Sequence, residues 1–195
     1  AQTMFQSSAA GVISLIRDRE TDFSKELFVA PVSRYGIVLG KIIGESFVSL
    51  VQGVGIVAFG LIIGVPITLA ALAAMAPVAF ASALLGGAFG ILVLGNVREQ
   101  RTTAQLFPFV IFPQFILAGV FNPIKDLPPV VEWLSRITPM SYPVDLMRGV
   151  FYYGAPEASL AVVRHPLVNA AVMLALFFAF LLAGTWLFIR KERER

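Results

Sequence analysis

Residues 167–189, LVNAAVMLALFFAFLLAGTWLFI, carry no charged side chain and decide the fold class. A helix needs about 20 consecutive apolar residues to cross the hydrocarbon core of a bilayer, and this stretch is long enough. Because lipid offers no water to an open backbone, such a stretch is typical of a spanning helix. Runs of similar character occupy three further ranges, which are 42–65, 69–94 and 105–121. The sequence therefore predicts an all-α, polytopic membrane bundle.

The composition of the whole chain agrees with this prediction. Hydrophobic residues make up 57% of the 195 residues and charged residues 14%, with a mean hydropathy of +0.82. A soluble domain averages about 25% charged residues, so the excess apolar surface needs lipid around it. Cysteine is absent, which excludes disulfides and thiolate metal sites. No basic run is interleaved with aromatics, so we expect no nucleic acid as a partner.

The first residues are interpreted as the remainder of a further span. Met4 to Ile16 is moderately apolar, but it is too short to cross a bilayer alone and runs directly into Arg17. It lacks the basic flank and cleavage site of a signal peptide. We therefore expect a fragment that begins in the last turns of a truncated span, with one membrane domain over residues 1–195.

Lysine and arginine are distributed unevenly between the two sides of the predicted bundle. With four alternating spans, residues 1–41, 95–104 and 190–195 share one side, and they hold most of the basic residues. The opposite side holds Lys125, Arg136, Arg148 and Arg164. Cytoplasmic loops are enriched in such residues, so we expect the C-terminus and residues 17–41 in the cytoplasm.

Small residues recur at four-residue spacing within the predicted spans. The pairs are Gly40 and Gly44, Gly60 and Gly64, and Gly86 and Gly90. Such pairs let helix backbones approach closely. Since glycine is common in membrane helices, each pair is either a helix contact or an ordinary part of a span.

The chain lacks the motifs of an enzyme or of an ion-driven pump. Residues 36–41, GIVLGK, have one residue too few between the glycines of a phosphate-binding loop, so we expect no ATP on this chain. His165 is the single histidine, and we interpret it as an interfacial side chain. Glu45 is the one acid inside a predicted span, and Lys41 lies one helical turn before it. A local ion pair is therefore favoured over an ion relay.

A charged segment, residues 17–31 (RDRETDFSKELFVAP), precedes the first full span. Thr21 or Asp22 can cap a short helix there, and Pro31 ends it. The segment carries nearly as many acids as bases, which argues against attraction to anionic lipid headgroups. A protein partner fits better. Ser33 is expected to cap the helix that enters the span.

The loop at residues 122–164 is far longer than a turn between spans requires. Pro128 and Pro129 suit the first turn of a helix capped by Asp126, and Pro139 ends that helix. Its apolar stripe consists of Val130, Trp133, Leu134 and Ile137. A second helix is expected from Ser141 to near Gly154. These helices are either surface decoration at the outer leaflet or an external gate or re-entrant cap, and we favour the gate or cap over decoration.

Two sets of motifs resemble a known family. The first is Asp18-Arg19-Glu20, Lys25-Glu26-Leu27, Ala30-Pro31-Val32-Ser33-Arg34 and Leu39-Gly40-Lys41. The second is Phe121-Asn122-Pro123, Leu127-Pro128, Trp133-Leu134, Ile137, Pro139 and Arg148. Together they resemble the permeases of ABC-2 type transporters, with drug-resistance and nodulation-type exporters as the nearest relatives, over nearly the whole chain.

The resemblance implies a six-span permease of the bacterial inner membrane that works as a homo- or heterodimer with two ATP-binding subunits. ATP and Mg would be bound by those subunits, and no cofactor by this chain. The four full spans would correspond to the family's third to sixth. The residues implied to couple to the ATPase are Arg17, Asp18, Arg19, Glu20, Phe23, Lys25, Glu26, Leu27 and Pro31. Those implied to form the external gate are Trp133, Pro139 and Arg148.

The leading hypothesis from the sequence is the membrane subunit of an exporter that moves a drug, a lipid or a lipid-linked glycan. The absence of an internal ion carrier favours an external source of energy. A passive membrane scaffold is the alternative. A membrane-embedded enzyme ranks last, because the chain offers no cluster of His, Asp or Glu at the lipid interface.

Overall fold

The computed structural model describes residues 1–20, 33–95, 97, 99–121 and 128–193, with the backbone alone for 15–20 and 191–193. Within these ranges every regular element is an α-helix. The helices are α1 (Gln2–Glu20), α3 (Arg34–Ile62), α4 (Leu69–Val93), α5 (Gln100–Leu117), α6 (Pro129–Ile137), α7 (Ser141–Phe151), α8 (Ala158–Ala161) and α9 (Pro166–Arg193). The predicted all-α membrane bundle is confirmed.

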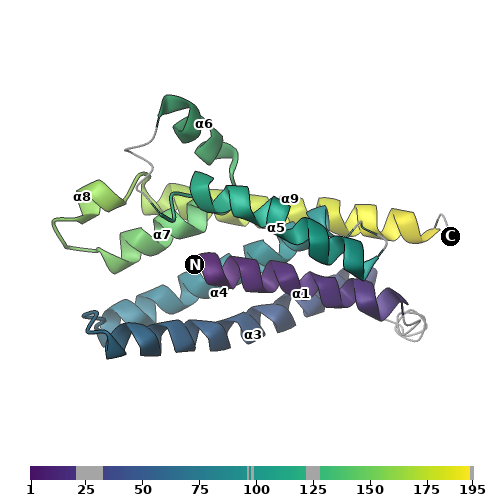
Figure 1. The fold of residues 1–195 in the computed structure, drawn as a ribbon, viewed down its shortest axis with the longest axis horizontal. Helices are drawn as coiled ribbons and strands as arrows, with labels where there is room; N and C mark the ends of the chain where they lie inside the picture. Colours follow the sequence, from purple (N-terminus) through teal and green to yellow (C-terminus); the bar gives the residue numbers. More distant parts are fainter. Residues whose placement is uncertain (21–32, 96, 98, 122–127, 194–195) are drawn as a thin grey trace.

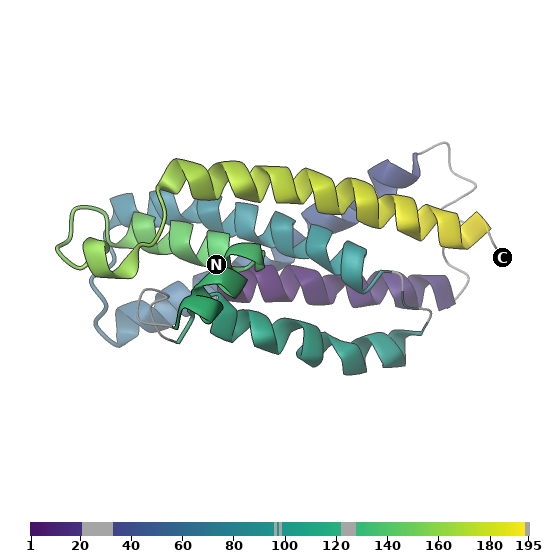
Figure 2. The same ribbon diagram turned by 90° about the horizontal axis from the view of Figure 1, so that it is seen from above.

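The five long helices run side by side along the longest axis of the molecule (Figures 1 and 2). The end of α1, the start of α3 and the end of α9 lie together at one end of the bundle, here called the inner end. The turn between α3 and α4 and the short helix α8 lie at the opposite, outer end (Figure 1). The charged segment 17–31 therefore begins at the inner end, beside the C-terminal residues.

Three stretches are long and apolar enough to cross a membrane in the part of the chain described. They are Arg34–Ile62, Leu69–Val93 and Ala158–Arg190, which correspond to α3, α4 and mainly α9. The predicted spans 42–65, 69–94 and 167–189 lie largely within these stretches. The fourth predicted span, 105–121, overlaps α5, which starts at Gln100 with four polar residues and ends at Leu117. A crossing by α5 stays a prediction.

Side-chain caps begin α3 and α4, and the first of them, Ser33, is the cap predicted from the sequence. The Ser33 hydroxyl accepts a hydrogen bond from the backbone N–H of Gly36 at 3.1 Å, and Thr68 accepts one from Ala71 at 3.1 Å. Each cap satisfies a backbone donor that the helix itself leaves unpaired. Between the two helices Gly64 takes a φ of +84°, a conformation open to glycine at little cost. The α3–α4 hairpin thus has a tight turn.

The closest helix contact in the described bundle joins α1 to α4. A Cβ atom at Gly86 would overlap the backbone of Phe5, and one at Gly90 would lie 2.8 Å from the carbonyl oxygen of Ala9. The Gly86–Gly90 pair is therefore a helix contact. Gly40 and Gly44 have no atom within 4 Å of the Cβ position, so that pair makes no such contact in the described chain.

Burial is concentrated in the inner half of α3 and the inner half of α4. The buried residues of α3 are Val38, Ile42, Ser46 and Ser49, and those of α4 lie between Val78 and Ile91. The outer halves of both helices expose apolar side chains such as Val51, Phe59 and Leu69. A soluble protein rarely exposes so much contiguous apolar surface, whereas lipid accommodates it.

The α1–α4 contact generates a prediction. Gly86→Leu should lower the free energy of unfolding by about 1–3 kcal/mol or more, because the new side chain meets backbone rather than a flexible side chain. Gly44→Leu is the matched control, since the space around Gly44 is open. Both variants are compared with the parent by thermal unfolding in detergent. Equal losses of stability for the two variants would contradict the assigned contact.

Candidate functional site

The residues predicted to couple to an ATPase lie at the inner end of the bundle or outside the described residues. Arg17, Asp18, Arg19 and Glu20 form the last turn of α1, whose backbone alone is described. The remaining ones, Phe23, Lys25, Glu26, Leu27 and Pro31, lie outside the described residues. The structure thus places the start of this segment at the inner end of α1, and the coupling role stays a prediction.

Glu45 is the one acid in α3, and it forms a local ion pair. Lys41 Nζ lies 3.0 Å from Glu45 Oε1, one helical turn away, and both side chains are partly exposed. The carboxyl group also lies against Gly11 of α1, where a Cβ atom would collide with it. The predicted ion pair is confirmed. Helix α1 contacts α3 at this point through Gly11, which has no side chain.

The outer part of the described chain forms a cap, which we define as residues 128–165 with helices α6, α7 and α8. Pro128 and Pro129 begin α6 and Pro139 follows its end, as predicted, while Asp126 lies outside the described residues. The stripe predicted on α6 is largely exposed, with Val130, Trp133 and Ile137 each more than 60% accessible. Figure 1 shows α6 standing off the side of the bundle.

Helix α7 returns from the base of α6 toward the outer end and is half-buried against α4 and α9. It begins at Ser141, as predicted, and ends at Phe151, three residues before Gly154. Arg148 on this helix donates a hydrogen bond to the carbonyl oxygen of Gly119, which follows α5 with a φ of +68°. A cation at the C-terminal end of a helix stabilises its unpaired carbonyls. Arg148 thus joins α7 to the end of α5.

A buried carboxylate, Asp145, forms the densest set of polar contacts in the described cap. Its side chain is 1% exposed and accepts hydrogen bonds from the backbone N–H groups of Val163 at 2.8 Å and Arg164 at 2.9 Å. Asn169, in the first turn of α9, donates a third at 2.8 Å. Hydrogen bonds to an ionised acceptor are about twice as strong as neutral ones. Asp145 therefore ties α7 to both the loop before α9 and α9 itself.

Arg164 extends the same set of contacts to α6. Its guanidinium lies 4.7 Å from the centre of the Tyr142 ring, in a cation–π arrangement. One of its nitrogens also lies 3.5 Å from the hydroxyl of Ser135 on α6. Tyr142 in turn donates a hydrogen bond to the backbone carbonyl of Arg136. Helices α6 and α7 and the start of α9 are thus connected through one arginine.

The three residues predicted as the external gate occupy different parts of the cap. Trp133 lies on the exposed face of α6, Pro139 lies between α6 and α7, and Arg148 points from α7 to the end of α5. The structure adds Asp145 and Asn169, which the sequence reasoning missed. A lone acid within the apolar run 142–147 (YPVDLM) was the available signal.

His165 lies at the start of α9 rather than in a cluster of ligands. Its Nδ1 accepts a hydrogen bond of 3.3 Å from the backbone N–H of Leu167, and the imidazole is exposed. No group of three or more His, Cys, Asp or Glu residues suited to a metal ion occurs in the part of the chain that the structure describes. The histidine therefore serves the local geometry of the α9 N-terminus.

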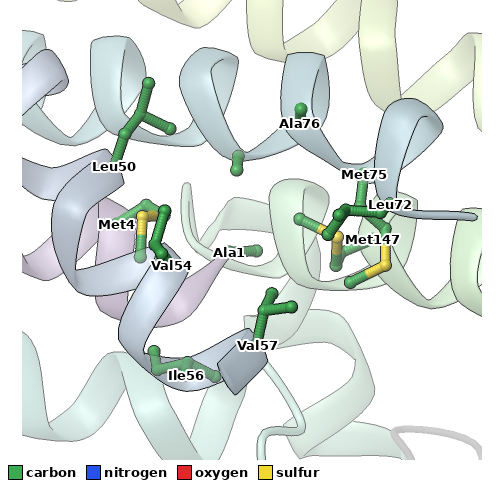
Figure 3. Close-up of a pocket in the computed structure, with 12 residues that line it drawn as sticks. Ala1, Met4, Leu50, Val54, Ile56, Val57, Leu72, Met75, Ala76 and Met147 are labelled. Carbon is green, nitrogen blue, oxygen red and sulfur yellow. The ribbon is translucent and has the colours of Figure 1, made fainter. Parts of the chain in front are cut away.

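An apolar cavity of about 390 Å³ lies where α1, α3, α4 and α7 meet (Figure 3). Three methionines from different helices, Met4, Met75 and Met147, contribute to its wall, as does the first residue, Ala1. The other side chains that line it are aliphatic. Such a surface can hold only apolar atoms, because it presents no charged or hydrogen-bonding side chain.

These features define a class of protein: a polytopic α-helical membrane protein with charged residues at its inner end and a folded helical cap at its outer end. Comparison with known families then identifies it. Residues 1–152 match the model of the ABC-2 type transporter family, and the chain belongs to this family.

Two curated relatives from Escherichia coli strain K12 agree with this assignment. The chain is 25% identical over 166 residues to a protein named "Probable multidrug ABC transporter permease YbhR", covering 84% of this chain and 44% of that protein. It is 29% identical over 144 residues to "Inner membrane transport permease YhhJ", covering 73% of this chain and 38% of that one. The chain spans less than half the length of these relatives.

The buried contacts of Asp145 generate a prediction. Asp145→Ala should lower the free energy of unfolding by on the order of 3 kcal/mol, because one buried and two partly buried donors lose their acceptor. Glu157→Ala is the control, since Glu157 is an exposed acid of the same cap. The measurement is unfolding in detergent followed by circular dichroism. A loss at position 145 no larger than at 157 would contradict the assigned role.

Proposed function

We propose that this chain is part of the membrane-spanning subunit of an exporter that uses ATP hydrolysed by a separate ABC subunit. The observation that carries this proposal is the family match over residues 1–152, joined to the position of residues 17–20 at the end of α1. Helix α1 ends and α3 begins at the inner end of the bundle, and the charged segment lies between them in the sequence (Figure 1). A force applied there by a partner acts on both helices.

The coupling region of this proposal is residues 17–31. Its charge is nearly balanced, and it carries Phe23 and Leu27 at a spacing that suits one face of a helix. A partner surface with a groove for these apolar side chains, and with charges for Arg17, Glu20 and Lys25, would bind it specifically. ATP and Mg would then be held by the partner, and this chain would supply neither catalytic residues nor a nucleotide site.

The outer cap is the external gate in this proposal, with Trp133, Pro139 and Arg148 as its residues. Support comes from the position of the cap over the outer part of the bundle and from its polar contacts to α5 and α9. The buried carboxylate of Asp145 accepts hydrogen bonds from the residues before α9 and from α9 itself, so the cap is fixed to the bundle rather than loosely attached.

The proposed cargo is a hydrophobic or amphiphilic compound, such as a drug, a lipid or a lipid-linked glycan. Apart from the last turn of α9, the described helices α3, α4 and α9 carry a single acid, Glu45 of α3. Lys41 forms an ion pair with it. A pathway along such helices offers no relay for ions and favours apolar contacts. Two copies of the permease, or this subunit and a homologous one, would together enclose the route, with the C-termini in the cytoplasm.

The coupling region supplies a direct test. Glu20→Arg and Phe23→Asp should each abolish capture of the candidate ATPase by the full-length protein. ATP turnover by the ATPase in the presence of either variant should equal that of the ATPase alone. Glu157→Arg is the charge-matched control at the outer cap, and it should bind like the parent. The readouts are affinity capture from detergent and phosphate release.

Unchanged capture by both coupling variants would contradict the assignment of residues 17–31. If the parent protein itself captured no ATPase, the wider proposal of an ATP-driven transporter would fail, and a passive scaffold would be the better explanation.

A further inference from the structure

The cap is attached to the bundle by two polar joints of very different strength. The first joins Asp145 of α7 to Asn169 of α9, and the same carboxylate holds Val163 and Arg164, the cap residues that lead into α9. Asp145 and Asn169 are 1% and 0% exposed, so water does not compete for the hydrogen bond between them. Separating α7 from the start of α9 would leave the buried carboxylate and the buried amide of Asn169 without each other and would release two partly buried N–H groups, which is strongly disfavoured.

The second joint is the hydrogen bond from Arg148 to the carbonyl oxygen of Gly119, at the end of α5. It is a single hydrogen bond from a side chain that is only partly buried. A long cationic side chain reaches water readily when it is released. This joint can therefore open at much lower cost than the first.

Apolar contacts do not change this ranking. Met140 and Val144 of the cap pack in one cluster with Ile111 and Ala118, which belong to α5 and its end. The same cluster includes Met173 of α9, so the apolar packing of the cap is shared between α5 and α9 and favours neither. The three hydrogen bonds of Asp145 have fixed directions and tolerate little displacement.

We infer that the cap moves as one body with α9, fastened by Asp145, and opens against α5 by release of Arg148 from Gly119. Arg164 strengthens this body, because its backbone is held by Asp145 while its side chain reaches Tyr142 and Ser135. Asp145 is thus a positioning residue that holds α7 on the start of α9, whereas the contact between Arg148 and Gly119 is the one that separates. The inference rests on the proposed function only in treating the cap as a gate, and the joints themselves are testable without an ATPase.

The test measures distances between spin labels in the full-length protein in lipid nanodiscs. One pair, Leu160→Cys with Leu174→Cys, reports on α8 against α9, and the other, Leu160→Cys with Phe112→Cys, reports on α8 against α5. All three positions are exposed, and these 195 residues contain no native cysteine. The distance distributions are recorded by pulsed dipolar spectroscopy in the parent and in each variant.

Asp145→Asn should broaden the α8–α9 distribution at least twofold, because an amide cannot accept from donors on both of its sides. Arg148→Gln should broaden the α8–α5 distribution and leave the α8–α9 distribution narrow. Glu157→Gln, at an exposed acid, should change neither. Asn169→Ala removes one of the three hydrogen bonds and should give an intermediate width, so it serves if Asp145→Asn fails to fold.

Two results would overturn the inference. The first is an α8–α9 distribution that stays as narrow as the parent's in both Asp145→Asn and Asn169→Ala. The second is a broadening of the α8–α9 pair by Arg148→Gln equal to that by Asp145→Asn. Neither result bears on whether the protein binds an ATPase, which the capture experiment measures separately.

Discussion

Hydrocarbon cannot hydrogen-bond a peptide group, and the arrangement of this chain follows from that constraint. Apolar stretches must fold into helices whose backbone donors and acceptors pair internally, with side-chain caps such as Ser33 and Thr68 at the exposed ends. Helices that have no hydrophobic force between them in lipid then associate by close packing of small residues. The contact of Gly86 and Gly90 with the backbone of α1 is the clearest case.

The same constraint explains the polar groups of the outer cap. A carboxylate as buried as Asp145 persists because backbone and amide donors surround it, and a guanidinium such as Arg148 persists because it caps the carbonyl end of α5. The charged side chains of α7 therefore bond to groups where another helix ends or where a loop meets a helix. One apolar cluster joins α1, α3, α4 and α9 toward the inner end, and a second joins α1, α4, α5, α7 and α9.

Local rules allowed much of this fold to be predicted from the sequence. Length and hydropathy located α3, α4 and α9, Pro128 and Pro139 bounded α6, and the Lys41–Glu45 spacing identified the ion pair. Asp145 was missed because its partners lie 18 to 24 residues later, so no local sequence pattern predicts the contact. Which glycine pair makes a helix contact also depends on which helices become neighbours, and local sequence patterns do not predict that.

The central claim is that the full-length protein moves an amphiphilic compound across the membrane with energy from a separate ATPase. The most direct measurement is the ATP-dependent transport of a fluorescent amphiphile in proteoliposomes that contain the full-length permease and its ATPase, with the ATPase alone as control. The account predicts transport that requires both subunits and hydrolysable ATP. Robust ATP hydrolysis by the assembled complex with no movement of any amphiphile tested would contradict it.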